Sequence, residues 1–71
     1  MLEMRPDCEK CGRDLPPDSQ EALICSFECT YCQDCRLESC PNCGGDLAPR
    51  PTRAAHRLAL YPASTLRRHK P

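Results

Sequence analysis

The spacing of eight cysteines constrains this 71-residue chain more than any other feature of its sequence. The pattern is C-x2-C-x13-C-x3-C-x2-C-x2-C-x4-C-x2-C, and it places Cys8, Cys11, Cys25, Cys29, Cys32, Cys35, Cys40 and Cys43. In a C-x2-C pair the turn directs both sulfurs toward one point, and two such pairs complete the tetrahedral four-thiolate shell that zinc prefers. Gly12 and the Gly44-Gly45 pair follow two of these turns and accept the positive φ angles that they need. The spacing therefore predicts two structural Zn²⁺ ions.

Other chemistries compete for the same cysteines. A disulfide framework fits less well, because residues 1–7 hold no apolar stretch of signal-peptide length, so we expect a cytoplasmic protein with reduced thiols. A redox dithiol lacks a βαβ pattern around it. An iron–sulfur cluster is a closer rival, since Cys29-x2-Cys32-x2-Cys35-x4-Cys40-Pro41 differs by one residue from a bacterial ferredoxin run. The extra residue before Cys40 and the neat pairing of the other cysteines argue against it.

The apolar composition makes metal ions necessary. Leu, Ile and Phe together number ten of 71 residues, and Trp is absent. A chain this short cannot bury a sizeable core and needs cross-links such as metal ions to stabilise its fold. Its length excludes a multi-domain enzyme or a Rossmann or barrel fold, and no apolar run is long enough to span a membrane. We therefore expect one small metal-stabilised domain.

Two ways of sharing the ligands are open. A sequential scheme joins Cys8, Cys11, Cys25 and Cys29 at one ion and Cys32, Cys35, Cys40 and Cys43 at the other. A crossed scheme assigns site 1 to Cys8, Cys11, Cys32 and Cys35 and site 2 to Cys25, Cys29, Cys40 and Cys43. Only the crossed scheme interleaves the loops, so that one core of Leu23, Ile24, Phe27 and Leu37 packs between both metals. We favour it because apolar residues are so few.

The remaining pattern predicts two regions of an α+β fold. Residues 1–47 form the two-zinc domain, with a strand over residues 22–28 and one or two helical turns over residues 32–39. Residues 48–71 form a basic Pro/Arg-rich extension, which begins with a stiff linker at residues 48–51. Thr52 is expected to cap a short helix over about residues 52–61, which ends before Pro62 and is followed by a frayed tail.

The cysteine order resembles a RING-type cross-brace (a treble-clef arrangement), with Cys29 where that family often has His. The final Cys40-Pro41-Asn42-Cys43 also resembles its last pair. RING ubiquitin ligases dock their conjugating enzyme through an apolar residue between the first two ligands, where this chain has Glu9-Lys10. The resemblance therefore implies zinc binding, and ubiquitin-ligase activity is not expected.

A closer resemblance covers nearly all of the chain up to Asp46. The segments Met1-Leu-Glu-Met-Arg-Pro, Asp14-Leu-Pro-Pro-Asp-Ser, Ile24-Cys-Ser-Phe-Glu-Cys-Thr and Cys40-Pro-Asn-Cys-Gly-Gly are similar to a family of small bacterial proteins. That family is catalogued as domain of unknown function 1272. The resemblance implies a bacterial cytosolic origin and zinc binding, and it supplies no activity.

Charge is divided unevenly along the chain. All ten acidic residues lie between Glu3 and Asp46. Six basic residues follow Asp46 without any acid: Arg50, Arg53, Arg57, Arg67, Arg68 and Lys70. This basic tail has three interpretations: a solvated end, a segment docked on the acidic head, or a contact for nucleic-acid phosphates. The last is weakly supported, because the tail holds no aromatic residue for base stacking apart from Tyr61.

The expected function is binding rather than catalysis. All-cysteine shells are closed to water and substrate, and no carboxylates pair as acid and base, so we expect no enzyme activity and no small-molecule substrate. His56 and His69 are assigned to solvent because eight cysteines already fill two shells. We expect a module that binds a protein partner, with Arg53, Arg57, Leu58 and Tyr61 as candidate contacts. The alternatives are a nucleic-acid-associated protein that uses the tail, and a zinc buffer or sensor.

Overall fold

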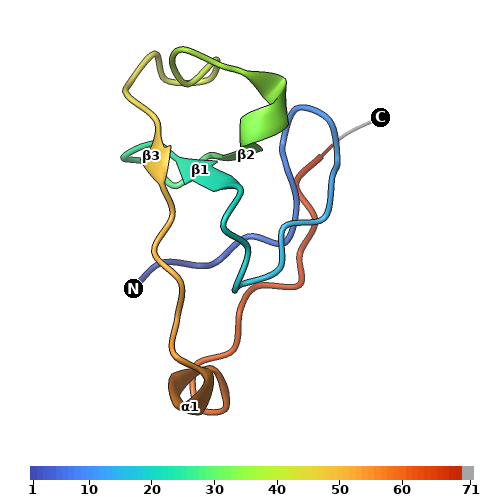
Figure 1. Cartoon of the computed structure of the whole chain (residues 1–71), viewed down its shortest axis with the longest axis vertical. Helices are drawn as coiled ribbons and strands as arrows, with labels where there is room; N and C mark the ends of the chain where they lie inside the picture. Colours follow the sequence, from blue (N-terminus) through green and yellow to red (C-terminus); the bar gives the residue numbers. More distant parts are fainter. Residues whose placement is uncertain (70–71) are drawn as a thin grey trace.

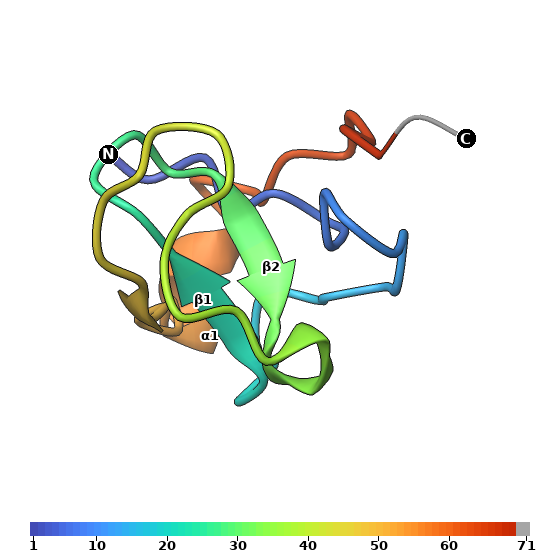
Figure 2. The ribbon, with the colours of Figure 1, turned by 90° about the horizontal axis from the view of Figure 1, so that it is seen from above.

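A three-stranded antiparallel sheet lies at the middle of the fold (Figure 1). The computed structural model describes residues 1–69 and contains β1 (Ala22–Ile24), β2 (Thr30–Cys32), the 3-10 helix η1 (Gln33–Cys35), β3 (Ala48–Pro49) and α1 (Ala55–Leu58). The strand order is β2-β1-β3, and Leu23 of β1 lies opposite Tyr31 on one side and Pro49 on the other. These short elements form a small α+β protein, whose cysteine loops lie around the sheet (Figure 2).

The strand predicted over residues 22–28 is shorter than expected. It ends at Ile24 because the chain reverses at residues 25–29, where the Cys25 N–H donates to the Cys29 carbonyl at 3.2 Å and the Glu28 N–H donates to the Cys25 carbonyl at 3.0 Å. Glu28 takes a left-handed conformation with φ of 65°. Cys25 and Cys29 therefore lie at the base of a tight turn between β1 and β2.

The predicted core is wrong in placing Phe27 inside, and it omits several residues that are buried. Phe27 lies at the tip of the 25–29 turn with 71% of its surface exposed, whereas Leu37 is half-buried against the core. The fully buried positions belong instead to Leu15, Ala22, Asp7, Thr30 and cysteines, and Tyr31 is 4% exposed. Cysteine side chains themselves fill the space between the loops, so little room is left for a large aromatic ring.

The helix predicted over about residues 52–61 is also wrong in extent. Only Ala55–Leu58 is helical, its N-cap is Ala54, and no side chain caps it. Arg53 instead turns its guanidinium back to the carbonyls of Leu2 and Tyr61. A single uncapped turn loses most of the free energy that a longer helix would gain. No helix within residues 1–69 is long and apolar enough to cross a membrane.

Arg50 is a buried cation that joins three segments. Residues 48–49, expected as part of a linker, form β3, and the Arg50 side chain that follows is 5% exposed. Its guanidinium donates to the carbonyls of Arg5 (2.8 Å), Pro16 (2.8 Å) and Leu15 (3.3 Å). Burial lowers the pKa of Arg50, and no carboxylate within residues 1–69 forms an ion pair with it. The N-terminal lead-in, the 15–16 loop and β3 are thus held by one side chain.

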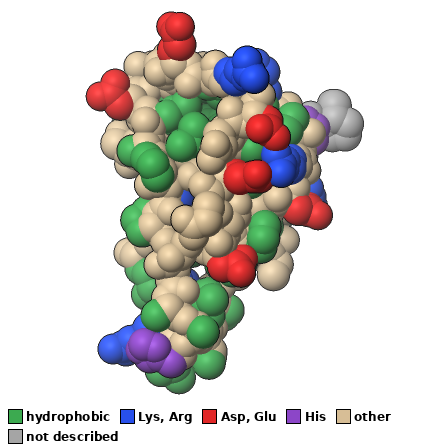
Figure 3. All heavy atoms as spheres, in the orientation of Figure 1, with side chains coloured by type: hydrophobic (Ala, Val, Ile, Leu, Met, Phe, Trp, Pro, Cys, Tyr) green, Lys and Arg blue, Asp and Glu red, His purple; other side chains and the backbone are tan. Residues whose placement is uncertain are grey.

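The C-terminal segment is docked rather than frayed. Residues 64–69, named here the C-terminal strap, run beside the N-terminal segment (Figure 1). The Ser64 N–H donates to the Glu3 carbonyl at 2.9 Å, and Arg68 pairs with the Glu3 carboxylate at 2.7 Å. Figure 3 shows acidic and basic side chains interleaved on the surface near the C-terminal end. The distribution of charge thus supports docking of the tail on the acidic head.

Replacing Arg50 tests whether this side chain holds the fold together. Arg50→Gln leaves three backbone carbonyls without their donors, so we expect a loss of at least about 2 kcal/mol, which lowers the Tm by about 8 °C or more. Thermal unfolding of the metal-loaded protein measures it. Arg57→Gln, at an exposed position of the same extension, is the matched control and should leave the Tm unchanged. An equal Tm for the two variants would contradict this role.

Candidate metal centres

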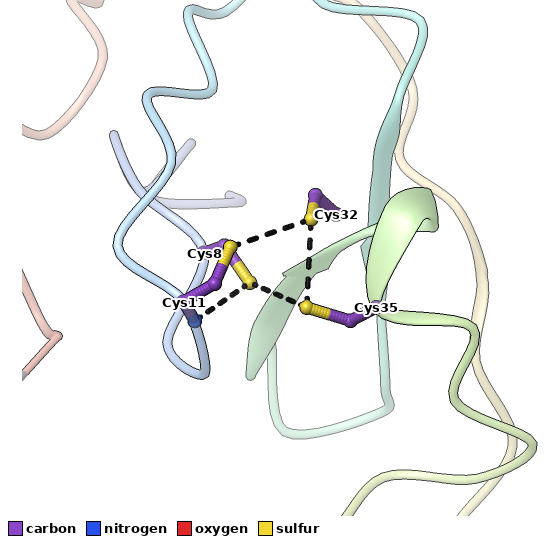
Figure 4. Close-up of side chains that lie close together, drawn as sticks. All are labelled: Cys8, Cys11, Cys32 and Cys35. Atoms are coloured by element: carbon purple, nitrogen blue, oxygen red, sulfur yellow. Dashed lines mark hydrogen bonds between the residues drawn. The ribbon is translucent and has the colours of Figure 1, made fainter.

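Four cysteines from two distant segments bring their sulfurs together (Figure 4). The Sγ atoms of Cys8, Cys11, Cys32 and Cys35 all lie within 4.8 Å of one another. The measured contacts are 3.7 Å for Cys8–Cys35, 3.6 Å for Cys11–Cys32 and 3.6 Å for Cys32–Cys35. A tetrahedral shell with zinc–sulfur bonds of about 2.3 Å has sulfur–sulfur edges of about 3.8 Å. This first cluster therefore has the dimensions of a single four-thiolate metal site.

A second cluster joins the 25–29 turn to the segment around residues 40–43. The Sγ atoms of Cys25, Cys40 and Cys43 lie within 4.8 Å of one another. Cys29 is buried beside them, but its sulfur falls outside this common distance and accepts a hydrogen bond from Asn42 Nδ2 at 3.3 Å. Three thiols are thus grouped for a metal ion, and the fourth lies next to them.

The two clusters contain copies of one backbone turn. In residues 8–13, the first knuckle, the Cys8 N–H donates to the Arg13 carbonyl (2.8 Å), the Gly12 N–H to the Cys8 carbonyl (2.8 Å) and the Cys11 N–H to the Cys8 sulfur (3.5 Å). In residues 40–45, the second knuckle, the same three bonds join Cys40 to Gly45 (2.9 Å), Gly44 (2.8 Å) and Cys43 (3.4 Å).

Glycine occupies the fifth position of each knuckle, directly after its second cysteine. Gly12 has φ of 81° and Gly44 has φ of 78°, which is the left-handed region where a Cβ atom is strained. The other cysteine pairs reach their positions differently: Cys35 ends η1, and Arg36 then turns left-handed with φ of 50°. Four of the five positive φ angles among residues 1–69 thus lie in or beside the cysteine turns, and the fifth is at Met4.

Hydrogen bonds prepare the leading cysteine of each knuckle as a thiolate. Burial by itself raises the pKa of Cys8, but N–H donation, chiefly from Cys11 and Cys32, lowers it to about 7. Burial likewise acts against ionisation of Cys40, and backbone donation from Cys43 and Asn42 lowers its pKa to about 6. Metal ions bind the thiolate form, which the surroundings of these two sulfurs favour.

Cys35 and Cys29 resist ionisation without a cation. Burial and the neighbouring Cys32 and Cys8 raise the pKa of Cys35. Burial also raises the pKa of Cys29, and Cys25 and Cys40 act in the same direction. Because negative thiolates crowd one another here, a divalent cation would relieve the repulsion and favour the charged form.

Two polar side chains at the second cluster were missed in the sequence. Tyr31 is buried with its Oη 3.8 Å from Cys40 Sγ, and burial together with Cys40 raises the pKa of this phenol. Asn42 donates to Cys29. The sequence could have indicated both residues, because Tyr31 lies between two cysteines and Asn42 lies within the last cysteine pair.

The structure separates several groupings that the sequence left open. The ferredoxin-like set Cys29, Cys32, Cys35 and Cys40 is divided between the two clusters, and the sequential set Cys8, Cys11, Cys25 and Cys29 is divided as well. Neither His56 nor His69 joins a cysteine cluster within residues 1–69. Among the candidate partner contacts, Arg57 and Tyr61 are exposed, Leu58 is half-buried, and Arg53 is bonded to the chain itself.

Fold and clusters together define a small cysteine-rich α+β protein with two cysteine clusters suited to metal ions. The chain belongs to the DUF1272 family of proteins of unknown function, which matches residues 1–53. It is also 57% identical over 75 residues to the uncharacterized protein R02474 of Rhizobium meliloti (strain 1021), a match that covers 100% of this chain and 89% of the relative. No solved structure matches it. The resemblance to this bacterial family is confirmed.

Gly44 gives a direct test of the knuckle geometry. Gly44→Ala places a Cβ at a positive φ and should cost about 1 kcal/mol, seen as a lower Tm and weaker metal retention by the second cluster. Gly44→Asn should cost less, because Asn tolerates this conformation. Gly12→Ala carries the same strain and also meets the His69 ring, whose Cδ2 lies 2.8 Å from the new Cβ. If Gly44→Ala and Gly44→Asn behave as the wild type, the turn does not depend on glycine.

Proposed function

We propose that this protein is a non-catalytic structural zinc module with two ions held in the crossed arrangement. Site 1 is Cys8, Cys11, Cys32 and Cys35, and site 2 is Cys25, Cys29, Cys40 and Cys43. The observation that carries the proposal is the first cluster, whose sulfur contacts of 3.6–3.7 Å match the edges of a zinc tetrahedron. A small movement of the Cys29 side chain completes the second shell.

The ligand chemistry favours zinc in a structural role. Four thiolates without histidine or carboxylate form a closed shell, which leaves no position for water or substrate. The only carboxylate with no exposed surface among residues 1–69 is Asp7, and it accepts backbone N–H groups from Arg68 and His69. Nothing in this arrangement offers a general base beside a metal-bound water.

The crossed arrangement supports a RING-like cross-brace as the fold type. The first cluster joins the knuckle at residues 8–13 to the end of β2, while the second joins the 25–29 turn to the knuckle at residues 40–45. The two ligand sets alternate along the chain, as they do in a cross-brace. Charged Lys10 is exposed between the first two ligands, which does not favour the docking mode of ubiquitin ligases.

A protein-binding role is favoured by the exposed Phe27. This aromatic ring stands on the tip of a turn whose two ends, Cys25 and Cys29, belong to the second metal site. A rigidly held, exposed aromatic side chain is a typical anchor in protein interfaces. Nucleic-acid binding by the tail has less support, because Arg50, Arg53, Arg67 and Arg68 are bonded to groups of the chain itself.

Native mass spectrometry tests the metal content. The purified protein should carry two zinc ions and absorb no visible light, while Cys11→Ser and Cys43→Ser should each carry one. Ser26→Ala, at an exposed position between two ligands, is the control and should keep both ions. Each structural zinc contributes on the order of 10 kcal/mol to folding, so EDTA should abolish the circular dichroism of the folded state. Visible absorbance with bound iron, or a folded metal-free chain, would refute the proposal.

Substitution of Phe27 tests the interaction role. Phe27→Ala removes an exposed ring, so the zinc content and Tm should stay as in the wild type while co-purification of a specific protein partner falls by about tenfold or more. Lys10→Ala, exposed on the first knuckle, is the matched control. Retention on DNA that is lost at high salt, with no protein partner, would instead favour the nucleic-acid alternative.

A further inference from the structure

The two knuckles share one backbone geometry but have different surroundings. A Cβ built on Gly12 would meet the imidazole of His69, with its nearest atom at 2.8 Å, whereas one on Gly44 would meet nothing within 4 Å. Residues 41–44 of the second knuckle are all exposed. Because the two turns carry the same hydrogen bonds, this difference comes from the C-terminal strap, which covers only the first.

The C-terminal strap holds the first knuckle on both of its sides. Ahead of Cys8, the buried carboxylate of Asp7 accepts the N–H of Arg68 at 3.0 Å and of His69 at 2.9 Å. After Cys11, the Arg67 guanidinium donates to the Gly12 carbonyl at 2.6 Å and pairs with Asp14 at 2.5 Å. The segment that carries Cys8 and Cys11 is therefore fixed at its entry and at its exit.

Loss of a metal ion requires a ligand segment to swing away from it. The first knuckle can swing only after the strap has released Asp7 and Gly12, whereas the second knuckle opens directly into solvent. The second cluster has another weakness, since the Cys29 sulfur lies apart from the other three and is held by Asn42. Both differences favour the release of a metal ion from the second cluster before the first.

We infer that the strap makes the two metal sites kinetically unequal: site 1 retains its ion to hold the fold, and site 2 exchanges its ion with acceptors in solution. This inference rests on the proposed two-zinc function and assigns the exchange of Zn²⁺ to one half of the molecule. The acceptor or donor is a zinc chelator of the thiol or carboxylate class. Each site has one exposed cysteine, Cys11 in site 1 and Cys43 in site 2, and only the turn that carries Cys11 is held by the strap.

Chelator challenge with thiol mapping tests the order of release. The full-length two-zinc protein is mixed with EDTA and N-ethylmaleimide, its zinc content is followed by native mass spectrometry, and the alkylated cysteines are located by peptide mapping. A one-zinc species should accumulate with Cys25, Cys29, Cys40 and Cys43 alkylated. Simultaneous alkylation of both sets, or earlier alkylation of the site 1 cysteines, would overturn the inference. A protein that never loads two zinc ions would instead refute the proposed function.

Charge reversal tests the strap itself. Arg67 forms ion pairs with Asp14 at 2.5 Å and with Asp7 at 3.9 Å. Arg67→Glu replaces both pairs by repulsion and should speed zinc loss from site 1 by about fivefold or more, with site 2 unchanged. Asp14→Arg added to Arg67→Glu should restore the slow rate. Arg57→Glu, on the exposed face of α1, is the matched control and should have no effect. An unchanged rate in Arg67→Glu would overturn the role of the strap.

Salt provides the same test without any substitution. Ion pairs at the surface weaken as ionic strength rises, so about 1 M NaCl should speed release from site 1 of the wild type more than release from site 2. Arg67 is half exposed, which makes its pair with Asp14 accessible to this screening. Equal acceleration of the two sites would contradict the inference.

Discussion

Convergence of thiols from distant parts of the chain is the constraint on which the rest of this structure depends. Cys8 and Cys11 meet Cys32 and Cys35 at the end of β2, so two short segments that share few apolar contacts become neighbours. The strands are two or three residues long and could not hold such a fold by hydrogen bonding alone. In the proposed state a metal ion turns the mutual repulsion of four thiolates into the strongest attraction in the molecule.

Around these clusters, polar side chains hold distant segments together, as apolar side chains do in the cores of larger domains. Arg50 reaches three backbone carbonyls from a buried position, and Asp7 receives two backbone N–H groups from the strap. Hydrogen bonds offset much of the cost of burying a charge, although the buried Arg50 Nε has no partner within residues 1–69. Each of these groups joins segments far apart in the sequence. A chain with so few large apolar residues thus closes its fold with fixed backbone contacts.

The same knuckle occurs twice in this fold, in two different environments, and this difference connects the fold to the proposed function. Two segments with the same C-x2-C-G pattern, at residues 8–12 and 40–44, form the same turn because the glycine supplies the positive φ in both. The strap then covers one copy and leaves the other in solvent. A difference between the two proposed sites therefore arises from packing rather than from ligand chemistry.

The sequence by itself determined the knuckles, the absence of a large core and the membership in DUF1272, because these follow from local spacing, composition and motif. It did not determine the exposure of Phe27, the burial of Tyr31 and Leu15, or the shortening of the helix to Ala55–Leu58. Those outcomes depend on which distant groups compete for the same space and the same hydrogen-bond partners. The tertiary structure alone decided that the basic tail pairs with the acidic head, since Arg67 meets Asp14 and Arg68 meets Glu3 only once the sheet and the cysteine clusters have brought both ends of the chain together.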